Sequence, residues 1–386
     1  MAFPIGAAVT LEQLALDPHA LLARLRAHEP ASWVPALDGW LITQHGLALS
    51  VMHDAETFTV EDPRFSTAQV VGASMLSLDG ERHSQHRAPF AVAFRPLAVR
   101  ERFAETVTLE ADRLIDALFC ARGAEIRRSF AGPLAADIVS RALGLGESEV
   151  TGLLAWYDAI VAGVTAITAG RAVTDEARRA FAALSQRLLE VIDGADRSSL
   201  LATAAAGGEL TPAQAVSNAA VLLFGGIETT EGMIVNAVLV LLEHPEALAR
   251  VRADPALLDA AIDESLRLEP AAAVVDRYAT ARVRLVEADI GAGDLVRVSI
   301  TAANRDPAVF ADPDRFDLDR VNARRHIAFA HGPHVCLGIH LARLEAREAL
   351  ARLLARFPRL RLDPERRAAV EGLVFRKPPA LHVRWD

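Results

Sequence analysis

The sequence contains little cysteine and almost no lysine. Its 386 residues include only two cysteines, Cys120 and Cys336, which excludes a disulfide framework and makes a reducing compartment the default expectation. Cys120 lies in the amphipathic helical run LIDALFCAR, where we expect a small buried hydrophobe. Lys377 is the only lysine among 41 basic residues, a bias that we attribute to the codon usage of a GC-rich genome.

Further absences limit the location and the partners. No stretch of about 18 uninterrupted apolar residues occurs, and the N-terminal residues lack the early positive charges of a signal peptide, so we expect a soluble cytoplasmic protein. The net charge of -9 disfavours nucleic acid as the main partner, because binding to phosphate backbones requires a basic surface. No flavin- or nicotinamide-binding glycine fingerprint is found, so any electrons must come from another protein.

The chain nevertheless has ample material for a large core. Hydrophobic residues make up 52% of the sequence, whereas charged residues make up 24%. Helical periodicity dominates about residues 79–268 and 337–357, and strand-like alternation with turn residues occupies about 31–44, 274–300 and 358–386. No linker, repeat or low-complexity tract divides the sequence. We therefore predict one mainly α domain with a smaller β portion over residues 1–386.

The segment HIAFAHGPHVCLGIHLARLEAREAL places Cys336 among histidines and glycines directly before a helical run. One interpretation is a zinc site, for which the candidate ligands are His331, His334, Cys336 and His340. However, no second ligand pair with the usual spacing completes such a site. The other interpretation is a metal held in a flat macrocycle and bound by Cys336 alone, with Gly332 and Gly338 leaving room for the ring. The positive end of the following helix would favour the thiolate form of Cys336.

This segment resembles the haem-binding signature of the cytochrome P-450 monooxygenases. The matching residues are Phe329, Gly332, His334, Cys336 and Gly338. The family often has glycine where Ala330 stands, a position that tolerates other residues. The resemblance implies the cytochrome P-450 fold, with haem b between a long central helix on the oxygen side and the helix that follows the cysteine. It also implies that Cys336 is the thiolate ligand of the iron and that Phe329, His334 and Gly338 help to bind the haem.

A long apolar helix is predicted upstream, in the stretch SNAAVLLFGGIETTEGMIVNAVLVLLEHP. Gly225 and Gly226 should each weaken the helix interior by about 1 kcal/mol relative to alanine, and Glu228 and Thr229 follow them. A tolerated kink with Glu228 turned to solvent is one interpretation. The other is a local helix opening that holds dioxygen and water while Glu228 and Thr229 relay protons. Gly226, Glu228 and Thr229 resemble the family's oxygen-activation motif, which favours the second interpretation.

Two more groups of residues resemble family motifs. His83 and Arg87 would share one helix face. Glu264 and Arg267 would share another, although this pair taken by itself would be an ordinary surface pair. The resemblance implies that the haem propionates are contacted by His83, Arg87, Arg277 and His334. It also implies a structural cluster, which anchors the cysteine segment and consists of Glu264, Arg267 and Arg320.

The expected substrate pocket is assigned by position in the family. It comprises Val221, Phe224, Gly225, Ala273, Val274, Val275, Val374 and Phe375. Because most of these side chains are apolar, we expect a mainly apolar small organic substrate. The resemblance implies insertion of one oxygen atom from O2, in secondary metabolism, with electrons from a ferredoxin and its reductase. The basic residues that could dock the ferredoxin, or be simply solvated, are Arg95, Arg100, Arg343 and Arg347.

Other functions stay open at this point. A haem-thiolate site also suits oxidative coupling or peroxide-driven oxidation, although a peroxide-driven enzyme has no need for the proton relay at Glu228 and Thr229. A haem carrier or gas sensor is a function of another class. Such a protein would not need a weakened helix beside the ligand site, and would normally carry a signalling segment.

Overall fold

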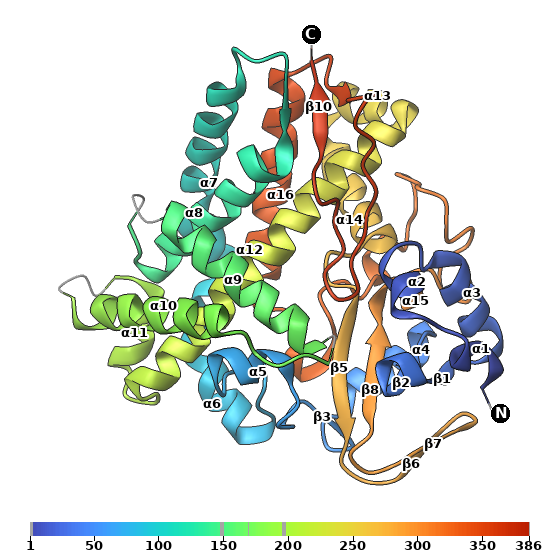
Figure 1. Cartoon of the computed structure of the whole chain (residues 1–386). Helices are drawn as coiled ribbons and strands as arrows, with labels where there is room; N and C mark the ends of the chain where they lie inside the picture. The colour runs from blue at the N-terminus through green and yellow to red at the C-terminus, as the bar shows by residue number, and fades with distance from the viewer. Residues whose placement is uncertain (1–2, 147–149, 169, 195–197, 386) are drawn as a thin grey trace.

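Helices fill most of the molecule; the strands of the largest sheet lie beside the N-terminal helices, whereas β10 lies at the opposite end, next to the C-terminus (Figure 1). The computed structural model describes residues 3–146, 150–168, 170–194 and 198–385. The α-helices are α1 (Pro4–Ala7), α2 (Leu11–Ala15), α3 (His19–His28), α4 (His45–His53), α5 (Ser66–Val71), α6 (Gly80–Ala91), α7 (Pro96–Leu118), α8 (Gly132–Leu143), α9 (Val150–Thr168), α10 (Asp175–Asp193), α11 (Leu200–Ala206), α12 (Pro212–Glu243), α13 (Pro245–Ala253), α14 (Leu258–Leu268), α15 (Ile300–Ala303) and α16 (Ile339–Arg356). The predicted mainly α fold with a smaller β portion is confirmed.

The strands of the described residues form three separate sheets. They are β1 (Ala31–Val34), β2 (Gly39–Ile42), β3 (Phe58–Thr59), β4 (Gly123–Glu125), β5 (Val274–Ala279), β6 (Val283–Leu285), β7 (Ala288–Ile290), β8 (Leu295–Ser299), β9 (Arg361–Leu362) and β10 (His382–Arg384). The largest sheet has the order β1-β2-β8-β5-β3, in which only β2 and β8 run parallel. The others are β4-β10-β9 and the hairpin β6-β7. The C-terminal segment therefore returns to pair with a strand from the helical region.

Helix α12 is the central element of the helical region. Its N-terminus is fixed by a capping box, in which Thr211 and Gln214 satisfy each other's backbone N–H groups. The helix packs against α8, α14 and α16. Among the described residues it is the one helix long and apolar enough to cross a membrane, but 78% of its most apolar window is buried inside the protein. Its composition is therefore that of a core helix.

The position of Cys120 differs from the prediction. Helix α7 ends at Leu118, and Cys120 lies in the turn beyond it with an exposed side chain. The apolar stripe of α7 faces the core only while the helical period continues. The expectation of a small buried hydrophobe at Cys120 was therefore wrong.

Candidate active site

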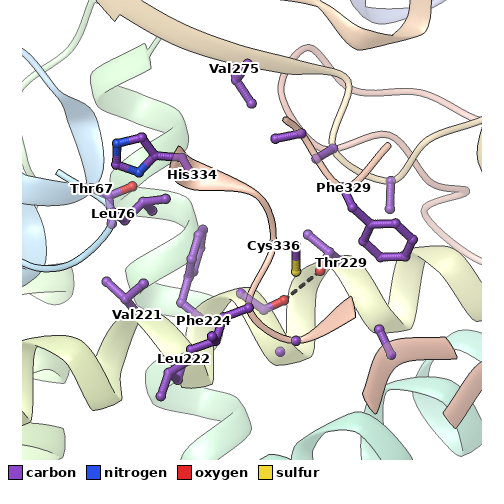
Figure 2. A pocket seen from close by; sticks show the side chains of 18 of the residues that line it. Thr67, Leu76, Val221, Leu222, Phe224, Thr229, Val275, Phe329, His334 and Cys336 are labelled. Atoms are coloured by element: carbon purple, nitrogen blue, oxygen red, sulfur yellow. Dashed lines mark hydrogen bonds between the residues drawn. The ribbon is translucent and has the colours of Figure 1, made fainter. Parts of the chain in front are cut away.

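A cavity of about 330 Å³ lies between α12 and the segment that carries Cys336. Figure 2 shows the sulfur of Cys336 pointing toward the part of α12 that carries Thr229. The walls are mostly apolar, with Phe224 and Phe329 among the labelled side chains. The arrangement brings a potential metal ligand and a hydroxyl group into one apolar space.

Backbone geometry holds the cysteine segment in a tight loop. The N–H of Cys336 donates to the carbonyl oxygen of Phe329 over 2.9 Å. Gly332 has a φ of 72°, and a Cβ at this position would lie 2.4 Å from the carbonyl oxygen of Met52, so only glycine fits. Ala330 also has a positive φ, of 57°, which strains any residue with a side chain. That strain explains why glycine suits this position in the resembling signature.

Burial raises the pKa of the Cys336 thiol, and the Gly338 N–H and Arg87 lower it only partly. The Gly338 N–H at the start of the following helix thus favours the thiolate, as expected, but burial has the larger effect on the thiol. A cationic metal that binds the sulfur would supply the missing stabilisation, because coordination deprotonates a thiol. A Cβ on Gly338 would make only an ordinary contact with Sγ, at 3.9 Å, so the surrounding polypeptide alone does not require glycine there.

Basic side chains gather at one end of the cavity, where Arg87, Arg277 and His334 line it and His83 packs against His334. Arg277 is buried, and burial lowers its pKa as it does that of Arg87. Burial, followed by the nearby charges of His334 and Arg87, lowers the pKa of His83 to about 4. The Nε2 atom of His83 is buried and finds no hydrogen-bond partner among the described residues. The unpartnered Nε2 of His83, together with Arg87 and Arg277, fits a ligand that carries carboxylates.

His334 is already engaged by a carboxylate of the protein. Its Nε2 lies 2.7 Å from Oδ1 of Asp79. Burial alone would raise the pKa of Asp79, but hydrogen bonds from His334, Thr59 and the Val60 N–H bring it to about 2. Asp79 therefore orients the His334 ring through Nε2. The propionate contact that the resemblance implies stays a proposal, and it would use another atom of the ring.

The geometry does not favour zinc. Among residues 3–146, 150–168, 170–194 and 198–385, no group of three or more His, Cys, Asp and Glu side chains is arranged to hold a metal ion. His331 instead packs against His53, with ring centroids 4.5 Å apart. The cavity, the single sulfur and the basic side chains at one end fit a flat, anionic macrocycle better than a tetrahedral ion.

Helix α12 is continuous past the cavity, so the expected local opening is absent from the described backbone of residues 212–243. The hydroxyl of Thr229 donates to the carbonyl oxygen of Gly225 over 2.6 Å, drawn as the dashed line in Figure 2. A Cβ on Gly226 would lie 3.1 Å from Val139, whereas a Cβ on Gly225 would meet no atom within 4 Å. Gly226 therefore lets α8 approach α12, and Gly225 leaves space in the cavity.

Glu228 does not line the cavity, although Thr229 and Thr230 do. Its Oε1 lies 2.7 Å from Nζ of Lys377, and its Oε2 accepts a hydrogen bond from the hydroxyl of Tyr157. The side chain is 4% exposed, so the interpretation with Glu228 turned to solvent is wrong. Residues 228 and 229 point in different directions because consecutive helical positions are about 100° apart.

Most of the expected pocket residues line the cavity. They are Val221, Phe224, Gly225, Val274, Val275, Val374 and Phe375. Ala273 does not, and its placement in the pocket was wrong. Its N–H donates to Val374 and its carbonyl accepts from Ile300, so its backbone is held between two neighbouring segments. Its side chain lies beside a much smaller second cavity.

The acid and the two arginines expected to anchor the cysteine segment meet in the interior. Nε of Arg267 lies 2.6 Å, and Nε of Arg320 3.0 Å, from Oε1 of Glu264. Arg267 also donates to the carbonyl oxygens of Asn304, Pro313 and Arg315. Glu264 and Arg267 are both fully buried, so this pair is not a surface pair.

The arginines expected to form a docking patch have different surroundings. Arg343 forms an ion pair with the buried Asp263, and Arg347 lies 3.3 Å from Asp259. Arg95 and Arg100 are exposed near the start of α7. Two of the four positive charges are thus largely offset by the protein's own carboxylates.

Three residues of the site were not predicted from the sequence. Tyr157 and Lys377 contact Glu228 from distant parts of the chain, and no local pattern marks them. Glu345 lines the cavity, and its Oε2 is buried without a hydrogen-bond partner among the described residues. Burial raises the pKa of Glu345 well above its usual value. The sequence could have indicated this position, because Glu345 is an acid within the apolar stripe of α16, between Leu341 and Ala349.

Comparisons with known proteins agree with this geometry. Residues 184–382 match the sequence profile described as cytochrome P-450. The chain is 36% identical to the cytochrome P-450 monooxygenase PikC of Streptomyces venezuelae, over 97% of this chain and 92% of PikC. It is 35% identical to nocardicin C N-oxygenase of Nocardia uniformis subsp. tsuyamanensis, over 100% of this chain and 98% of that enzyme.

A solved structure shares the whole architecture. The myxobacterial cytochrome P-450 CYP267B1, in complex with myristic acid, superposes with a TM-score of 0.87 and 30% sequence identity. The match covers 97% of this chain and 98% of that one. Members of the family bind haem b through a cysteine thiolate, and Cys336 with its surrounding cavity suits that group. The chain therefore belongs to the cytochrome P-450 family and is a haem-thiolate monooxygenase.

Proposed function

We propose that the protein inserts one oxygen atom from O2 into a mainly apolar small organic molecule of secondary metabolism. The observation that carries the proposal is the apolar cavity that contains both the Cys336 sulfur and Thr229. Nonpolar walls favour a ligand that is mostly hydrocarbon, with few polar anchors. The relative CYP267B1 was solved with myristic acid, which has this character.

Each part of the site has a proposed role. Cys336 would bind the haem iron, Phe329 and Gly338 would border the haem, and His83, Arg87 and Arg277 would hold its carboxylates. The bound haem supplies the activation of O2. Thr229 presents its hydroxyl to the cavity from α12. Glu228, whose carboxylate lies outside the cavity against Lys377 and Tyr157, is the group proposed to relay protons toward it. The Phe224 and Phe375 rings, 5.5 Å apart, orient the substrate.

Electrons come from a separate ferredoxin with its reductase, in the cytoplasm. The exposed Arg95 and Arg100 offer positive charge near Val92 and Leu97, which are 59% and 67% exposed. Exposed apolar side chains bordered by arginines suit the docking of an acidic protein. The short helix that includes Val92 packs against α16, which follows the cysteine segment. Docking there would bring the electron donor close to the Cys336 side of the haem.

The test is a spectral screen followed by turnover. The purified ferric protein is titrated with a library of small organic molecules that includes myristic acid, and displacement of water from the haem is followed in the Soret band. Binders are then incubated with NADPH, a ferredoxin and its reductase under labelled O2. We expect one labelled oxygen atom in the product. Products formed only with added peroxide, or coupled products without labelled oxygen, would contradict the proposal.

A further inference from the structure

The only lysine of the chain is buried beside Glu228. Lys377 is one of 41 basic residues, yet its side chain is only 8% exposed. Its Nζ lies 2.7 Å from Oε1 of Glu228 and 2.5 Å from Oε2 of Glu231. A compact ammonium group with three donors can bridge two carboxylates, whereas the planar fork of arginine needs more room.

The surroundings of Lys377 form a closed network of charges. Glu228 and Glu231 are three residues apart on α12 and would repel each other without a cation between them. Arg127 reaches the second oxygen of Glu231 at 2.8 Å, and Tyr157 donates to the second oxygen of Glu228. Two carboxylates are thus matched by two cations in the interior, as buried charges require.

Missing side chains make room for this network. A Cβ on Gly232 would lie 2.9 Å from the Cβ of Ala271 and 3.5 Å from Cδ of Lys377. The lysine stem therefore lies close to the backbone of α12. On the other side, a Cβ on Gly132 would lie 3.2 Å from Oε1 of Glu231.

Lys377 belongs to the same hairpin as the wall of the cavity. Glu371 and Lys377 form a backbone bridge, and Phe375 pairs with Ala272. Val374 and Phe375 line the cavity, and residues two apart on an extended segment face the same side. Figure 1 shows this C-terminal segment descending beside the upper end of β5. A molecule in the cavity thus contacts the hairpin two residues from the cation that holds Glu228.

We propose that Lys377 is the positioning residue for Glu228, and that the hairpin of residues 371–377 links substrate contact at Phe375 to the placement of this acid. The inference rests on the proposed proton-relay role of Glu228. A substrate that contacts Phe375 without displacing it keeps Lys377 paired with Glu228, so product formation stays coupled to NADPH consumption. A substrate that displaces Phe375 moves the cation away, and more of the reducing equivalents leave as peroxide.

The first test needs no substrate, because one lysine gives one signal. The full-length protein is labelled with [ε-13C]lysine and observed by NMR in its diamagnetic ferrous carbonyl form. We expect Glu228→Gln and Phe375→Ala each to move the Lys377 resonance beyond its linewidth, with Phe375→Leu as a milder variant. Glu365→Gln removes an exposed partner of Arg384 and should leave the resonance in place. A resonance unmoved by Glu228→Gln or by both Phe375 variants would overturn the proposal.

The second test measures product per NADPH on a compound obtained from the spectral screen. Lys377→Met should lower this ratio severalfold and raise peroxide, with the ferrous carbonyl spectrum and ligand affinity retained. Lys377→Arg should restore part of the ratio, since the charge returns. Arg282→Met, which removes an exposed cation of the β6-β7 hairpin, is the matched control.

A wild-type ratio in Lys377→Met would overturn the positioning role. Failure of the proposed function has a different signature, namely a wild-type protein without oxygen insertion. In that case the NMR test still decides whether Lys377 links the hairpin to Glu228.

Discussion

The backbone N–H of Cys336 donates to the carbonyl oxygen of Phe329 over 2.9 Å. This bond closes a loop of which both ends face the cavity, so the sulfur and the phenyl ring border the same space. The loop can be this tight only because Ala330 and Gly332 adopt positive φ angles. One of these two residues is not glycine, which has a measurable consequence.

Ala330→Gly should stabilise the protein. Alanine at a φ of 57° costs about 1 kcal/mol, and glycine removes that strain at the cost of a more flexible unfolded chain. We expect the free energy of unfolding to rise by about 0.5 kcal/mol in denaturant titrations of the haem-loaded protein. Ala328→Gly, two residues earlier, is the control and should lower it. A loss of stability in Ala330→Gly would show that its methyl packing outweighs the backbone strain.

Thr229→Ala should uncouple NADPH consumption from product formation. The hydroxyl lines the cavity beside Gly225, and no other group of Thr229 can carry a proton. Loss of a positioned proton donor typically costs about 100-fold in the assisted step, so most electrons should appear as hydrogen peroxide. Product, NADPH and peroxide are measured together.

The matched control for Thr229→Ala is Ser185→Ala. The Ser185 hydroxyl makes the same type of bond to the carbonyl four residues earlier, but on α10. It should keep the wild-type product ratio. Full coupling in Thr229→Ala would remove this hydroxyl from the mechanism.

Asp263→Asn should weaken the fold in a pH-dependent way. Burial alone would raise the pKa of Asp263, but His326 and Arg343 bring it to about 2, below the usual 3.8. A depressed folded-state pKa gives stability that is fully present above about pH 4 and is lost as the pH falls toward 2. The variant should therefore lose about 2 kcal/mol at neutral pH, because a neutral amide replaces the buried carboxylate that pairs with Arg343 and Arg324.

The deficit of Asp263→Asn should shrink below pH 4, where the wild-type carboxylate becomes protonated. Unfolding curves at several pH values measure this difference. Asp319→Asn removes an exposed partner of Arg250 and serves as the control, with little change expected. A deficit of constant size down to pH 2 would mean that Asp263 acts through packing and not through charge.

Local patterns predicted the parts of the site that lie within one segment. Three features of this kind are the Cys336 segment, the glycine-rich stretch of α12 and the proximity of Glu264 and Arg267. Each depends on the spacing of residues within one segment, and this spacing can be seen in the sequence. The direction of Glu228 could not be predicted, because Lys377 and Tyr157 reach it from far along the chain. The predictions for Cys120 and Ala273 were wrong for a similar reason. The end of α7 decides where Cys120 faces, and backbone hydrogen bonds with Val374 and Ile300 decide where Ala273 faces.

The central claim is that Cys336 binds the haem iron as a thiolate. The measurement is the absorption spectrum of the dithionite-reduced protein under carbon monoxide, for the wild type and for Cys336→Ser. We expect the red-shifted Soret band of a thiolate-ligated carbonyl in the wild type and its loss in the variant. A wild-type band at the position typical of histidine-ligated haem, or a red-shifted band that persists in Cys336→Ser, would contradict the claim.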